Sequence, residues 1–163
     1  MRSPICSPVA CVNFMTATPD RDQVQDLFDV LLTNRYYGWY AQTGDLVAAE
    51  RMLESELREW ARRGKPIVVA EYGADTQPGL HSMTAEPWSE EFQVDLLAMS
   101  HRVFDRIDAV VGEHVWNFAD FATTPGIMRV GGNKKGVFTR DRNPKAAAFA
   151  LRRRWRGDDE AAR

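Results

Sequence analysis

Length, composition and charge describe one folded domain and disfavour several classes of protein. The 163 residues are 44% hydrophobic and carry 21 basic against 23 acidic side chains, for a net charge of −2. The chain can therefore build a core, and its balanced charge gives no overall attraction to nucleic acid or an anionic membrane. Since residues 1–10 lack an export signal and no apolar run is long enough to span a membrane, we expect a cytoplasmic protein.

Short apolar runs alternate with amphipathic stretches along the chain, a pattern typical of a parallel sheet covered by helices. In chain order we predict a strand at 8–15, a helix at 20–28, a strand at 30–34, a helix at 45–63, a strand at 66–70, a helix at 90–104, a strand at 109–116 and a helix at 144–155. The fold class is therefore α/β.

Three of these elements carry the most information. The helix at 45–63 has Leu46, Ala49, Leu53, Glu56, Leu57 and Trp60 at three- and four-residue spacing. Asp45 is its predicted N-cap and Gly64 its predicted end. The helix at 20–28 is predicted because it opens in acidic residues, which the helix dipole favours. The strand at 66–70 is apolar throughout, which predicts burial on both faces.

The carboxyl ends of the predicted strands lead into loops rich in polar and aromatic residues. Ligands of parallel α/β folds bind at these ends, so the functional site is expected there. Four strands fit either a small doubly wound domain or half of an eight-stranded barrel, since a complete barrel needs about 250 residues. The pattern alone leaves both architectures open.

Glu71 follows the predicted strand at 66–70, so a rigid element would hold its carboxylate. This placement suits a nucleophile or a general base, although a strand-end carboxylate can equally cap the next turn. Four more polar or aromatic side chains follow the strand ends, namely Asn34, Tyr36, Tyr40 and Trp116. Rings and hydrogen-bonding groups together suit a sugar, whose faces are apolar and whose rim is polar, although aromatic clusters more often belong to a core.

Other chemistries find little support in the sequence. Cys6 and Cys11 are too few for a disulfide framework or a metal knuckle, and the spacing of His81, His101 and His114 suggests no zinc site. We therefore expect reduced thiols and no bound metal. The phosphate-binding and serine-hydrolase patterns GxxxxGK[ST] and GxSxG are absent. The loop at 131–136 presents an amide and an ammonium group that can bind a carboxylate, although a solvated basic loop is the commoner meaning.

Six segments of the chain are more specific than these patterns. They are 34–40 (NRYYGWY), 71–73 (EYG), 88–91 (WSEE), 103–106 (VFDR), 115–121 (VWNFADF) and 131–136 (GGNKKG). Together they resemble the bacterial β-glucuronidases of glycoside hydrolase family 2. The likeness extends from about Pro8 to Trp155, which is nearly the whole chain.

The resemblance implies a retaining β-glucuronidase built on a (β/α)8 TIM barrel, which is a homo-oligomer and needs no cofactor. By position, Glu71 matches the catalytic nucleophile of that family. Asn34, Tyr36, Tyr40 and Trp116 match residues that line the sugar pocket. Arg129, Asn133 and Lys135 match the stretch that reads the C6 carboxylate of a β-D-glucuronide, the implied substrate.

One departure from the family is large. The family's acid/base glutamate lies in an Asn-Glu-Pro motif at the end of the fourth barrel strand, and this sequence contains no such motif. The match begins at the fifth strand, which implies the C-terminal half of the barrel. Residues 1–7 would be an unmatched segment, 8–156 a partial glycoside hydrolase domain and 157–163 a charged tail.

A retaining mechanism needs a second carboxyl group about 5 Å from the nucleophile. The sequence offers four other carboxylates, of which Glu113 lies in the last predicted strand and Asp45, Asp75 and Asp120 lie on the ligand-face side, but it places none of them opposite Glu71. We therefore expect little or no turnover by the chain alone, and association with a second copy or with the other half of the barrel. A non-catalytic carbohydrate-binding or assembly module of the same fold is the alternative.

Overall fold

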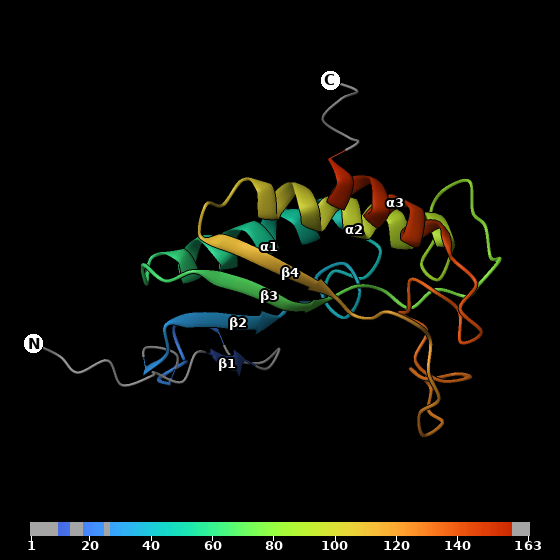
Figure 1. The fold of residues 1–163 in the computed structure, drawn as a ribbon, viewed down its shortest axis with the longest axis horizontal. Coiled ribbons are helices and arrows are strands. Elements are labelled where there is room, and N and C mark those ends of the chain that lie inside the picture. Colours follow the sequence, from blue (N-terminus) through green and yellow to red (C-terminus); the bar gives the residue numbers. More distant parts are fainter. Residues whose placement is uncertain (1–9, 14–17, 25–26, 158–163) are drawn as a thin grey trace, which may run out of the picture. The chain divides into compact units, whose positions relative to one another are not determined.

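The computed structural model describes residues 10–13, 18–24 and 27–157 (Figure 1). The chain divides into two compact units. The first comprises the described residues up to Tyr72 together with Ser100–Val115. The second comprises Gly73–Met99 and the described residues from Trp116 onward.

The first unit contains a parallel sheet whose strands follow one another in chain order, β1-β2-β3-β4 (Figure 1). Its strands are β1 (Ala10–Asn13), β2 (Val30–Asn34), β3 (Ile67–Tyr72) and β4 (Val110–Val115). The prediction of an α/β fold with parallel strands is confirmed. Of the predicted strand at 8–15, the ends lie outside the described residues.

Strand β3 lies between β2 and β4, but it is less deeply buried than predicted. Ile67 and Val69 are fully buried, whereas the alternate residues Val68 and Ala70 are half-buried. The prediction that both faces of this strand are buried is therefore wrong. Successive side chains of a strand point to opposite faces, and only one face of β3 is fully covered here.

Helix α1 (Leu46–Ala61) confirms the prediction at 45–63. The Asp45 side chain accepts a hydrogen bond of 2.9 Å from the Ala48 backbone N–H, which satisfies an otherwise unpaired donor of the first turn. The buried positions are Ala49, Leu53, Leu57 and Trp60. Beyond the helix, Gly64 adopts a left-handed φ of 67°, a conformation that glycine adopts without strain.

The predicted helix at 20–28 is wrong for the residues that can be described. Residues 18–24 contain turns and bends, Leu27 belongs to a 3₁₀ turn in which its N–H donates to the Val24 carbonyl at 3.0 Å, and 28–29 form a bend, while 25–26 lie outside the described residues. Acidic side chains make local hydrogen bonds instead of supporting a helix: Asp22 Oδ1 accepts from the Val24 N–H at 3.0 Å, and Asp20 accepts from the Thr18 hydroxyl. Such bonds compete with helical backbone pairing.

Two further helices confirm the remaining helical predictions. They are α2 (Glu90–Asp105) and α3 (Ala146–Arg156). The Glu90 carboxylate accepts a hydrogen bond of 2.7 Å from the Ala146 N–H, so a side chain of α2 caps the first turn of α3. Across the described residues, no helix combines the length and apolar character needed to cross a lipid bilayer.

Candidate functional site

Glu71 lies near the end of β3, in the first unit, and the end of β2 lies beside it. Asn34 is its register partner, and the Arg35 N–H donates a hydrogen bond of 2.8 Å to the Glu71 carbonyl. The Tyr36 hydroxyl donates a hydrogen bond of 2.7 Å to Glu71 Oε2. The structure therefore brings the predicted carboxylate, amide and phenol together at the carboxyl ends of two parallel strands.

The loop after β2 presents its aromatic rings around a small hollow. The Tyr36 and Tyr40 rings lie 5.2 Å apart, centroid to centroid. A pocket of about 200 Å³ is lined by Asn34, Arg35, Tyr36, Tyr37, Tyr40 and Ala41. The Asn34 Oδ1 atom is buried and accepts no hydrogen bond from any described residue. A buried acceptor without a donor carries a free-energy penalty, which a ligand hydroxyl could relieve.

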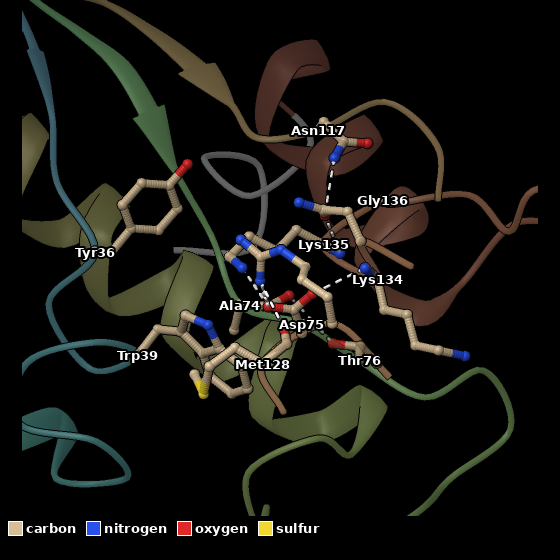
Figure 2. A network of polar contacts seen from close by, with 12 residues as sticks. Tyr36, Trp39, Ala74, Asp75, Thr76, Asn117, Met128, Lys134, Lys135 and Gly136 are labelled. Atoms are coloured by element: carbon tan, nitrogen blue, oxygen red, sulfur yellow. Dashed lines mark hydrogen bonds and ion pairs between the residues drawn. The ribbon is translucent and has the colours of Figure 1, made fainter. Parts of the chain in front are cut away.

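The second unit contains a buried network centred on Asp75 (Figure 2). Asp75 is fully buried, and its Oδ2 atom forms an ion pair with the equally buried Lys135. Arg129 Nη1 lies 3.5 Å from the same oxygen, and the Lys134 N–H donates to Asp75 Oδ1 at 2.8 Å. Two cationic side chains therefore surround one carboxylate, which leaves this cluster with one net positive charge.

Asn133 is also buried, two positions before Lys135 in the loop at 131–136. Its Oδ1 atom accepts hydrogen bonds from the Lys135 N–H at 3.0 Å and from Asn117 Nδ2 at 3.2 Å. Both donors bond the amide oxygen, and together they fix the orientation of the Asn133 side chain. Gly132 has a φ of 104°, and a Cβ there would lie 2.4 Å from the Phe121 carbonyl oxygen. Only glycine fits at that position, because the backbone of the loop next to Asn133 passes so close to Phe121.

A second buried ion pair supports this loop. Lys145 Nζ lies 2.9 Å from Asp120 Oδ1 and donates to the carbonyl oxygens of Thr76 and Lys134 at 3.1 and 3.0 Å. Burial lowers the pKa of Lys145 and raises the pKa of Asp120, and the attraction between the two groups opposes both shifts. One ammonium group thereby ties three loop segments together.

Trp116 follows β4 and belongs to the second unit, where its ring packs edge-on against Phe121 at 6.3 Å. The predicted site residues thus fall into two groups. Glu71, Asn34, Tyr36 and Tyr40 belong to the first unit. Trp116, Arg129, Asn133 and Lys135 belong to the second.

Each of the other predicted carboxylates contacts a partner within its own unit. Asp45 caps α1, Asp75 pairs with Lys135, and Asp120 pairs with Lys145. Glu113 Oε1 lies 3.7 Å from His101 Nε2. None of the four is therefore assigned the role of acid/base. Within the described part of the chain, no group of three or more His, Cys, Asp or Glu side chains could hold a metal ion.

Sequence reasoning missed the partners that hold these residues. Asp75 was weighed only as a possible acid, yet it neutralises Lys135, and Lys145 was not singled out at all. Lys135 and Asp75 are 60 positions apart, so no local pattern connects them. Glu56 was counted on the buried face of the helix at 45–63, and a carboxylate on such a face was a signal of a buried polar partner.

Comparison with known proteins identifies relatives over most of the chain. The family model described as "Glycosyl hydrolases family 2, TIM barrel domain" matches residues 7–157. A β-glucuronidase of Streptococcus agalactiae is 57% identical over 150 residues, which are 91% of this chain and 25% of that protein. A β-glucuronidase of Rattus norvegicus is 45% identical over 154 residues, 91% of this chain and 24% of that protein.

Solved structures agree with these matches. A Ruminococcus gnavus β-glucuronidase superposes with a TM-score of 0.86 at 46% identity, covering 90% of this chain and 26% of that one. A Ruminococcus gnavus β-glucuronidase solved in complex with D-glucuronic acid gives the same TM-score, identity and coverage. The chain thus spans about a quarter of the length of the relatives it matches. It belongs to glycosyl hydrolase family 2 and contains part of the family's TIM barrel domain.

Proposed function

We propose that this chain is the C-terminal half of the catalytic barrel of a retaining β-glucuronidase, with Glu71 as its nucleophile. The observation that carries the proposal is the Glu71 carboxylate at the end of a parallel strand, bonded to the Tyr36 hydroxyl at 2.7 Å. The four strands β1 to β4 would be the last four of the eight-stranded barrel. The named β-glucuronidase relatives, one of them solved with D-glucuronic acid, supply the substrate class.

In this mechanism, a Glu71 carboxylate oxygen attacks the anomeric carbon and the bond to the leaving oxygen breaks. The product is a covalent glycosyl-enzyme, which water then hydrolyses. Protonation of the leaving oxygen, and later deprotonation of the water, requires a second carboxyl about 5 Å from the first. Tyr36 holds one oxygen of Glu71 in place. Asn34, Tyr40 and Trp116 are proposed to line the sugar.

The second unit is proposed to bind the C6 carboxylate of the substrate. Lys135 and Arg129 together outweigh the charge of Asp75, and the remaining positive charge favours an anionic sugar. The Arg129 side chain is 29% exposed, and its contact with Asp75 is long, at 3.5 Å. Its guanidinium can therefore also contact a ligand. The amide N–H₂ of Asn133 can donate to a ligand, since the amide oxygen is the atom that accepts the bonds from the Lys135 N–H and from Asn117 Nδ2.

With a fluoride leaving group, the first chemical step can be tested without a general acid. With 2-deoxy-2-fluoro-β-D-glucuronyl fluoride, hereafter the fluoride reagent, a Glu71 oxygen forms the bond to C1, the C1–F bond breaks and fluoride departs without a proton. We expect this reagent to label the chain covalently, as measured by intact mass. Hydrolysis of a fluorogenic aryl β-glucuronide by the same sample should be about 10²- to 10⁴-fold below that of a complete enzyme, the usual contribution of acid/base catalysis.

The complete reaction can be tested in a chimera in which this chain replaces the matching quarter of the Streptococcus agalactiae β-glucuronidase. We expect the chimera to hydrolyse the aryl β-glucuronide and not to hydrolyse the corresponding aryl β-galactoside. A folded chimera without turnover, together with an unlabelled chain that still binds glucuronate, would support the binding-module alternative instead. The match of 57% identity makes the exchange conservative.

Association of the chain is a further prediction. Strands β1 and β4 are the edges of the sheet, and each has a pairing partner on one side only within the described residues. Separately, Phe149, Leu151 and Trp155 of α3 line an apolar groove of about 500 Å³, with Phe149 and Trp155 half or more exposed. Open edges and apolar grooves both favour association. We expect light scattering to report assemblies of at least two chains; a single monomer peak would contradict this prediction.

A further inference from the structure

We infer that Glu56, on α1, is the positioning residue that directs the Tyr36 hydroxyl at Glu71. The geometry belongs to the first unit alone. Its consequence for catalysis rests on the proposed function, in which Glu71 is the nucleophile.

The residues on either side of Tyr36 are both bonded to Glu56. Arg35 Nε donates to Glu56 Oε1 at 2.7 Å, and the Tyr37 hydroxyl donates to Oε2 at 2.8 Å. Tyr36 itself donates to Glu71. Both neighbours of Tyr36 in the chain are therefore anchored to one carboxylate of α1, which restricts the backbone at Tyr36 and with it the direction of the Tyr36 side chain.

The Glu56 carboxylate is saturated with donors. Trp60 Nε1 adds a third partner at 3.0 Å from Oε1, from the next turn of the same helix. The side chains of Arg35 and Glu56 are only 4% and 11% exposed. Charge-assisted hydrogen bonds in such a site are shorter and stronger than neutral ones, so the loop is held in one geometry.

One more contact extends this geometry to the end of β2. Arg35 Nη1 donates to the Asn34 carbonyl at 2.7 Å, which fixes the end of β2. Burial and the Glu56 hydrogen bond raise the pKa of Tyr37 to about 12, so its hydroxyl remains a donor at any pH at which the protein is handled. Glu56 thus sets the backbone on both sides of Tyr36.

The first test needs no substrate. The tyrosine ring resonances of the isotope-enriched chain are assigned by NMR. The Glu71→Ala variant then shows how the Tyr36 ring signals shift when the acceptor of the Tyr36 hydroxyl is removed. We expect Glu56→Gln to shift them in the same direction, because glutamine cannot accept all the bonds from Arg35, Tyr37 and Trp60. The matched control is Glu59→Gln, an equal charge change at an exposed position of α1. Unchanged Tyr36 signals in Glu56→Gln would overturn the inference.

The second test asks whether Glu56 acts through Tyr36. Glu56→Gln should slow labelling by the fluoride reagent about ten-fold, the effect of one misplaced hydrogen bond. In a Tyr36→Phe background the same substitution should change the rate by less than about two-fold, because the group it positions is gone. Equal slowing in both backgrounds would indicate a merely structural role and contradict the inference.

The two tests separate the inference from the proposed function. A wild-type chain that never reacts with the fluoride reagent would count against Glu71 as the nucleophile. The NMR response of Tyr36 to Glu56→Gln would still decide whether Glu56 positions that hydroxyl.

Discussion

Replacing Glu71 by glutamine is expected to reduce covalent labelling by the fluoride reagent at least about 10³-fold, because the amide oxygen is a poor nucleophile. Glutamine has the same size and shape and can still accept the Tyr36 hydrogen bond, so the fold should persist. Intact mass spectrometry over time measures the labelled fraction. In the chimera, the same substitution should abolish hydrolysis of the aryl glucuronide.

A matched control is available on the neighbouring strand. Glu113 is a carboxylate of β4 whose Oε1 lies 3.7 Å from His101 Nε2. Glu113→Gln makes the same chemical change in the same sheet, and it should be labelled at the wild-type rate. If Glu71→Gln is labelled as fast as Glu113→Gln, the assignment of the nucleophile is wrong.

Replacing Lys135 by methionine is expected to lower the free energy of unfolding by about 3–5 kcal/mol, because it leaves the buried Asp75 carboxylate without its closest cation. Arg129 remains, but its nearest nitrogen is 3.5 Å from Asp75 and its side chain is partly exposed. Urea or thermal unfolding measures the change. The preference for a glucuronyl over a glucosyl reagent should also fall, since one positive charge is removed.

Two comparisons make this prediction specific. Lys134→Met is the control, since Lys134 Nζ donates to the exposed Gln77 side chain at 2.8 Å and not to a buried carboxylate. The free energy of unfolding of this variant should change by less than about 0.5 kcal/mol. The double variant Asp75→Asn with Lys135→Met should regain much of the lost stability, because the buried charge is gone, without regaining the preference for glucuronyl. A Lys135→Met protein as stable as Lys134→Met would contradict the account.

Local patterns predicted much of the fold. The helix at 45–63 was found because its apolar spacing, N-cap and final glycine are all encoded within one segment, and the structure shows α1 with the Asp45 cap. The helix at 20–28 failed for an equally local reason, since Asp20 and Asp22 bond their own neighbours. Acidic residues favour both helix starts and turns, so the acidic cluster alone does not distinguish the two.

The site was predictable where it follows from strand ends. Glu71, Asn34 and Tyr36 meet because neighbouring parallel strands end together. The residues that hold them were not predictable in this way. Glu56 lies 21 positions from Arg35, and Asp75 lies 60 positions from Lys135, so these pairs are established only by the folded chain.

In the proposed function, Glu71 reacts at the anomeric carbon of a sugar that carries a C6 carboxylate. The most direct test is competition between the fluoride reagent and its glucosyl counterpart for the wild-type chain, with the labelled peptide located by tandem mass spectrometry. We predict a single label on Glu71 and at least about ten-fold faster reaction of the glucuronyl compound, the effect of one charge-assisted contact. A label on another residue, equal rates for the two reagents, or no label on a folded chain would contradict it.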